Sequence, residues 1–194
     1  MQLEHEFEVP ASPDRTLELM LDAERVVPCM PGAKLLEVVD ESTWKSELAI
    51  KLGPVGMQFR ADVKLLERDD AAKTVRLGVS ARDTRGKGGA EATVDSALHP
   101  TDSGGTRVAM ATDLRFSGQA AQLGRPGVVK DVSNKLVGQF AACIKGQLSA
   151  APEERAAAVE QAQRPVSGLS LAVAALVGAI KRVFGSGRER GETT

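Results

Sequence analysis

Alternation of apolar and polar residues dominates the first 118 positions of the chain. At residues 3–9, Leu3, Phe7 and Val9 alternate with polar positions, a period of two that is typical of a strand with one wet face. Similar segments recur at 44–50, 55–65, 75–79, 92–98 and 108–116, and the chain after Gly32 also reads as strand. Because the turns between successive segments are short and polar, the pattern predicts an antiparallel meander of six strands that joins the first strand in one sheet.

Two other regions have a helical pattern. Ser12 and Pro13 suit the cap and first turn of a short helix. A second helix is predicted at 23–27, and Pro28 ends it. From residue 119 to 148, apolar residues fall on one helical stripe. They are Val129, Val132, Leu136, Phe140, Ile144 and Leu148. The expected fold is therefore α+β, with a seven-stranded antiparallel curved sheet wrapped around a long C-terminal helix and two short helices after the first strand.

The chain changes character after the long helix. Large apolar residues nearly vanish between 151 and 165, so we expect a domain at 1–149 and, at 150–165, a linker with some helical tendency. Residues 166–180 carry no charge, and the pattern predicts an amphipathic helix at 166–185 before a disordered tail at 186–194. This run is short for a membrane span, so the helix is expected to lie in the membrane interface, or else to dock on this domain or a copy of it.

The lipid-facing stripe and its basic flank are specific residues. Apolar side chains for insertion are Leu169, Val173, Leu176, Val177, Ile180 and Phe184, and Lys181 and Arg182 would lie near anionic head groups.

Composition narrows the function. Lysine and arginine total 25 against 26 acidic residues, which argues against a nucleic-acid partner, and the 3% aromatic content favours an aliphatic pocket. Cys29 and Cys143 lie far apart without a Cys-x-x-Cys or histidine-rich motif, so neither a zinc site nor a disulfide is expected. The first residues lack the apolar run of a signal peptide, and a reducing cytoplasm fits the two cysteines.

Four strings occur in a characteristic order along the chain. They are Pro28-Cys29-Met30-Pro31-Gly32, Lys51-Leu52-Gly53-Pro54-Val55, Gly104-Gly105-Thr106-Arg107, and Ser117-Gly118-Gln119-Ala120-Ala121-Gln122-Leu123-Gly124 with Gln139-Phe140 further on. Over residues 2–148 the chain thereby resembles the carbon monoxide dehydrogenase G-subunit family, a branch of the START and pollen-allergen superfamily (SRPBCC). The resemblance implies a helix-grip domain with an apolar cavity, a membrane-seeking tail, and a molybdenum hydroxylase of the carbon monoxide dehydrogenase type as partner.

The cavity walls are expected at the strand positions, and on the face of the long helix, whose side chains point inward. The candidates are His5, Phe7, Met57, Phe59, Val79, Val94, Met110, Phe116, Leu136 and Phe140. Each of them also suits an ordinary core, and His5 is better explained as a core-edge histidine than as a ligand contact. His99 should face solvent, and Gly86-Lys87-Gly88-Gly89 should be a hairpin because it lacks the features of a phosphate-binding loop.

These expectations favour a non-enzymatic accessory protein without catalytic residues, metal or covalent cofactor. It would bind an apolar ligand, a respiratory quinone such as menaquinone, and recruit the hydroxylase to the inner face of the cell membrane. One alternative is an assembly factor for the hydroxylase with a filled core and no ligand. Another is a cyclase or hydrolase of the same fold, which would need convergent polar groups inside the cavity.

Overall fold

The computed structural model describes residues 1–52, 55–119, 121, 126–148 and 152–163. Its elements follow one another as a strand, three short helical segments, six strands and two further helices. They are β1 (Gln2–Val9), α1 (Pro13–Leu21), α2 (Ala23–Val26), the 3-10 helix η1 (Val27–Cys29), β2 (Ala33–Asp40), β3 (Thr43–Leu52), β4 (Val55–Asp69), β5 (Thr74–Asp83), β6 (Gly88–Pro100), β7 (Thr106–Gly118), α4 (Pro126–Leu148) and α5 (Pro152–Ala162).

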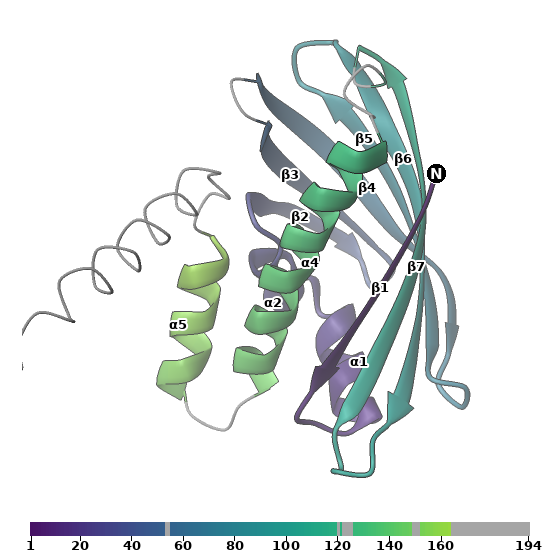
Figure 1. Ribbon diagram of the computed structural model, residues 1–194, viewed down its shortest axis with the longest axis vertical. Helices are drawn as coiled ribbons and strands as arrows, with labels where there is room; N and C mark the ends of the chain where they lie inside the picture. Colours follow the sequence, from purple (N-terminus) through teal and green to yellow (C-terminus); the bar gives the residue numbers. More distant parts are fainter. Residues whose placement is uncertain (53–54, 120, 122–125, 149–151, 164–194) are drawn as a thin grey trace, which may run out of the picture.

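The seven strands form one sheet in the order β1-β7-β6-β5-β4-β3-β2, and every neighbouring pair is antiparallel. The six later strands are a meander, and β1 pairs with β7. The sheet curves around α4, while α1 and α2 lie near one end of it (Figure 1). The α+β prediction and the expected helix-grip arrangement are confirmed.

Local chemistry explains where the first helices begin and how the chain turns into β2. Ser12 precedes α1 with extended backbone and a proline follows it, while the Asp22 side chain accepts a hydrogen bond of 3.2 Å from the Arg25 amide and caps α2. Gly32 has φ +76°, and a Cβ there would lie 2.3 Å from the Ala49 carbonyl oxygen. Only glycine fits this turn, because it needs both the left-handed conformation and the missing side chain.

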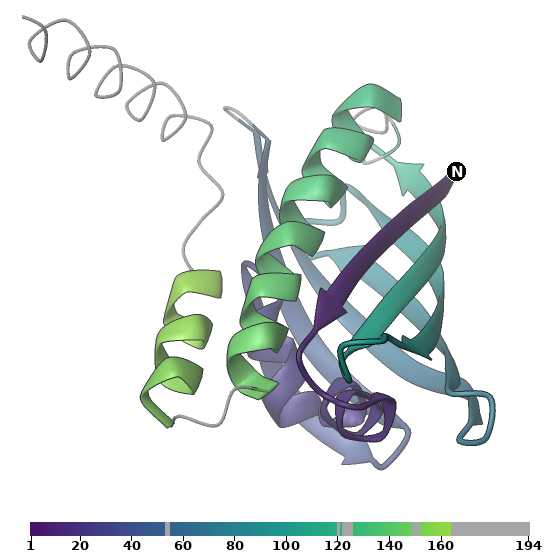
Figure 2. The same cartoon turned by 60° about the horizontal axis from the view of Figure 1, so that its bottom comes forward.

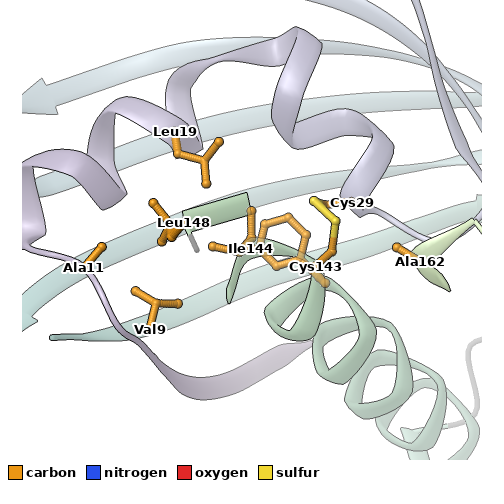
Figure 3. Close-up of a cluster of buried hydrophobic side chains, with 9 residues drawn as sticks. Val9, Ala11, Leu19, Cys29, Cys143, Ile144, Leu148 and Ala162 are labelled. Carbon is orange, nitrogen blue, oxygen red and sulfur yellow. A yellow bond between two sulfur atoms is a disulfide. The ribbon is translucent and has the colours of Figure 1, made fainter. Parts of the chain in front are cut away.

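The C-terminal half of α4 is held by the main core. Phe140, Ile144 and Leu148 are buried together with Val9 and Leu19 (Figure 3). The ring of Phe7 meets that of Phe140 edge to face, with the centroids 6.0 Å apart. This half of the helix is therefore fixed against β1 and α1 by close packing.

A disulfide joins the same half of α4 to η1. Cys29 and Cys143 are bonded, their Cα atoms are 5.3 Å apart, and they are 0% and 1% exposed. The expectation that no disulfide forms was therefore wrong. The two cysteines are separated by 114 residues, and only the packing of α4 against η1 brings them together.

The segment after α4, expected to be a linker with some helical tendency, is a helix that packs on the domain. Residues Pro152–Ala162 form the helix α5, which packs beside α4 (Figure 2). Ala162 is only 2% exposed within the main core, Val159 packs against that core, and the side-chain Nε2 of Gln163 donates to the Pro28 carbonyl oxygen at 2.8 Å. A helix with two apolar contacts thus extends the folded domain past residue 149.

The amphipathic helix predicted at 166–185 and the tail at 186–194 lie outside the described residues. Within the part of the chain that is described, no helix combines the length and apolar character that crossing a bilayer requires.

Candidate ligand cavity

A cavity of about 260 Å³ lies between the sheet and the N-terminal half of α4. Strands β3 to β7 supply one wall and the first turns of α4 supply the other. The lining residues are Leu48, Ile50, Met57, Phe59, Val79, Ala81, Ala90, Ala92, Leu114, Phe116, Val128, Val129, Val132, Ser133 and Leu136.

Small side chains on the sheet leave this space open. Ala81 of β5 pairs with Ala90 of β6, and Ala92 lies two residues further along β6 on the same face. The facing turns of α4 present Val129 and Val132. Methyl groups opposite short branched side chains do not fill the gap between helix and sheet. Further along α4, the larger side chains of Phe140, Ile144 and Leu148 close that gap.

The cavity is almost entirely apolar. Among the lining residues that the structure describes, Ser133 alone has a polar side chain, and its hydroxyl donates to the Lys130 carbonyl oxygen at 2.9 Å. Apolar burial, worth about 0.8 kcal/mol per methylene group, is therefore the main source of affinity that this site offers. The described residues also contain no cluster of three or more His, Cys, Asp and Glu side chains that could hold a metal ion.

Five of the residues that the sequence pattern predicted as cavity walls come together here. Met57, Phe59 and Val79 line the cavity from the sheet, as does Phe116, and Leu136 lines it from α4.

The other five lie elsewhere on the concave side of the fold. Phe7 and Phe140 belong to the main core, and Met110 packs against the buried cluster that contains Val108. His5 is half-buried on β1 opposite Met110. Neither His5 nor Met110 lines the apolar cavity, and both border a second, open hollow of about 1030 Å³.

Val94 is half-buried on β6, two residues beyond Ala92, and also lies outside the lining. These five residues lie outside the cavity for one reason. The concave face is longer than the cavity, and α1 with the C-terminal half of α4 covers the remainder.

Sequence reasoning missed the small residues that create the space. Ala81, Ala90 and Ala92 share the inward parity of their strands, but alanine is a weak marker of burial. The signal that could have found them is that alanines occur on the same face of two neighbouring strands. Val129 and Val132 were assigned to the apolar stripe of the long helix without being selected as cavity walls.

The second hollow differs in character. It crosses β1, β7, β6, β5 and β4, and seven of its fifteen described lining residues are charged. Arg76 donates to Asp95 at 2.6 Å and to Glu67 at 2.8 Å, and these hydrogen bonds and charges raise the pKa of Arg76. Such paired, half-exposed charges are typical of a hydrated sheet surface.

The β5–β6 hairpin lies next to the cavity strands. Asp83 accepts hydrogen bonds from the Arg85 amide at 2.9 Å and the Lys87 amide at 3.1 Å. Burial acts to raise the pKa of Asp83, but the hydrogen bonds from the Lys87, Arg85 and Gln58 backbones outweigh it and the pKa is lowered. The Gln119 amide also donates to the Lys87 carbonyl oxygen at 2.8 Å. The expected hairpin at residues 86–89 is confirmed.

A curved antiparallel sheet closed around one long helix, with an apolar cavity between them, defines a protein of the helix-grip, START-like class. Solved structures share this fold. A conserved protein from Geobacillus kaustophilus is 19% identical with a TM-score of 0.66, and the match covers 75% of this chain and 93% of that one. A norcoclaurine synthase point mutant from Thalictrum flavum, solved with a transition-state analogue, is 14% identical with a TM-score of 0.52, covering 77% and 96%.

A protein from Chromobacterium violaceum is 15% identical with a TM-score of 0.51, covering 74% of this chain and 97% of that one. The family of the carbon monoxide dehydrogenase G subunit (CoxG) matches residues 6–149, well over half of the chain. The protein belongs to this family. A search of the curated proteins finds no match.

Proposed function

We propose that this protein is an accessory ligand-binding protein that takes up an isoprenoid quinone of the menaquinone kind. It brings a molybdenum hydroxylase of the carbon monoxide dehydrogenase type to the inner face of the cell membrane, where electrons can pass to quinone. Membership of the CoxG family supports the accessory role and the partner. The observation that carries the ligand half is the apolar cavity under α4.

The size of the cavity suits part of a long apolar molecule. Pockets for drug-sized ligands measure about 300–1,000 Å³, and this one is slightly smaller at about 260 Å³. A ring or one or two isoprene units would fill it, and the rest of the molecule would leave past Val128, which lines the cavity and is 42% exposed. Burying a five-carbon unit gains roughly 4 kcal/mol before entropic costs.

The same observations weigh against the two alternatives. An assembly factor with a filled core would leave no void between sheet and α4. A cyclase or hydrolase would need converging acids, bases or nucleophiles, and the described lining offers one serine whose hydroxyl is already bonded to the helix backbone. The cavity therefore favours binding over catalysis.

The sequence of the C-terminal segment supports the membrane half of the proposal. Its uncharged run at 166–180 is followed by Lys181 and Arg182, a combination suited to the interface of an anionic bilayer. Gln163, the last described residue before this segment, is hydrogen-bonded to Pro28. The described chain before this segment is therefore attached to the domain at η1.

Ligand binding is tested on the full chain as purified. Organic extraction and mass spectrometry should find an isoprenoid quinone, and adding a short-chain menaquinone to delipidated protein should raise its melting temperature. Empty extracts together with an unchanged melting temperature would refute the ligand half.

Membrane recruitment is tested by co-sedimentation of the full chain with anionic and neutral liposomes. Leu176→Glu with Ile180→Glu places charge on the predicted apolar stripe and should abolish pelleting, whereas Ala175→Glu on the other side of the helix should preserve most of it. Equal pelleting of all three proteins would show that this segment is not the anchor. Capture of the hydroxylase onto the liposomes by the wild type but not by the double variant tests the recruiting role.

A further inference from the structure

Gln139 carries a polar atom for which the fold provides no partner. Its side-chain oxygen Oε1 is buried and accepts no hydrogen bond from any residue that the structure describes. No other buried side-chain nitrogen or oxygen in the described ranges is left in this state. Because an unmade hydrogen bond costs free energy, an orphaned buried acceptor is rare in native proteins and calls for an explanation.

Gln139 lies on α4 one turn beyond Leu136, the last residue of the helix that lines the cavity. It lies three residues after Leu136 and seven after Val132, on the helix stripe that lines the cavity. Side chains on a helix lean toward its N-terminus, over the preceding turn. This lean would place the amide over the turn of Leu136, at the inner end of the cavity. Gln139 is not itself part of the cavity wall and its oxygen is buried, so a ligand would meet it only by displacing the side chains at this end.

The cavity has little else to offer a polar group. Ser133 is the one polar side chain among the described lining residues, and its proton is used by Lys130. A primary amide has an acceptor oxygen and two N–H donors, so it can accept from a hydroxyl group or, after rotation, donate to a carbonyl. The same side chain therefore suits both a quinone and the corresponding quinol.

We propose that the Gln139 amide is the polar contact that selects, among apolar molecules, those that carry a carbonyl or hydroxyl group on the end that enters first. The ligand then lies with its ring at the inner end of the cavity and its chain directed toward Val128. This inference rests on the proposed function, because it requires an apolar ligand under α4.

The test compares two small probes that differ only in the relevant chemistry. Menadione and 2-methylnaphthalene share a fused ring pair and a methyl group, but only menadione has carbonyl oxygens. Their dissociation constants are measured by calorimetry on the delipidated full chain for wild type, Gln139→Leu and Asn134→Leu. Asn134 is an exposed residue of α4 and serves as the matched control.

The decisive quantity is the ratio of the two dissociation constants. Removing one hydrogen bond should shift this ratio against menadione by about two- to tenfold in Gln139→Leu, and Asn134→Leu should retain the wild-type ratio. Without ligand, Gln139→Leu should melt at least as high as wild type, because it removes a buried unpaired oxygen. A glutamine with a purely structural role would instead give a lower melting temperature and an unchanged ratio.

The outcomes separate this inference from the proposed function. If wild type and Gln139→Leu bind both probes with the same ratio, Gln139 is not the contact and the cavity remains a ligand site. If wild type binds neither probe, both proposals fail together. Should Gln139→Leu not fold, Gln139→Met, which is closer in shape, is measured in the same way and decides the question.

Discussion

Filling the cavity from the sheet side should stabilise the protein and block its ligand. Ala92 lies on β6 between Val79 of β5 and Leu114 of β7, and all three line the cavity. Ala92→Leu adds three carbons that enter empty space, so no neighbouring side chain has to move. At about 0.8 kcal/mol per carbon the gain is about 2.4 kcal/mol. Ordering the leucine costs about 0.5–1 kcal/mol, which leaves about 1.5–2 kcal/mol.

The assay is urea unfolding of the delipidated full chain, followed by quinone titration. The unfolding midpoint should rise without a change in slope, and the melting temperature should increase by about 3–8 °C. Quinone affinity should fall, because the leucine occupies the ligand's volume. Ala111→Leu adds the same carbons on the exposed side of β7, in the open hollow and outside the apolar cavity, and it should have little effect on either measurement.

Two results would refute this reasoning. A loss of about 1–3 kcal/mol in Ala92→Leu is what an already filled core produces, and it would mean that the cavity is not empty in solution. Equal stabilisation by Ala111→Leu would assign the gain to strand preference instead of the cavity.

Three further predictions test the frame around the cavity. Cys29→Ser should remove about 2–5 kcal/mol of stability by opening the bond to Cys143, and alkylation of the unfolded wild type without reductant should label neither cysteine; two labelled cysteines would contradict the disulfide. Asp83→Asn should lower stability by a constant amount well above pH 3.8, where the carboxylate is ionised in both folded and unfolded chains. Because the folded pKa is depressed, that difference should shrink as pH falls through it, and a difference that grows in acid would be inconsistent. Gly32→Ala should cost about 2 kcal/mol or more, since its Cβ would meet the Ala49 carbonyl at a positive φ, and an unchanged melting temperature would exclude this conflict.

The sheet and the long helix could be predicted because their periodicities are long and regular. In β4, Met57, Phe59 and Val63 alternate with outward polar residues, and one such strand fixes the parity of its neighbours. Parity identifies the face but not the position along a curved sheet. His5 and Met57 therefore looked equivalent in the sequence, although only Met57 lines the cavity.

The remaining errors came from contacts that only the tertiary fold creates. No local pattern relates Cys29 to Cys143, and their bond depends on the meeting of η1 and α4. Val159 and Ala162 are too few to form an apolar stripe, so the segment of α5 was predicted as a linker with some helical tendency and not as part of the domain. Gln139 was noted only within a family string, since nothing in the sequence shows that its oxygen lacks a partner.

The disulfide also anchors one end of the helix that covers the cavity. Every described lining residue lies between positions 48 and 136, inside the stretch from 29 to 143 that the bond closes into a covalent ring. The C-terminal half of α4 therefore stays tethered even when hydrogen bonds around it break. Gly138 lies between that half and the lining residues, and a Cβ there would meet nothing within 4 Å. A glycine without steric need weakens the helix at this point, so α4 resists bending least at Gly138, while the half beyond it is held by the disulfide ring.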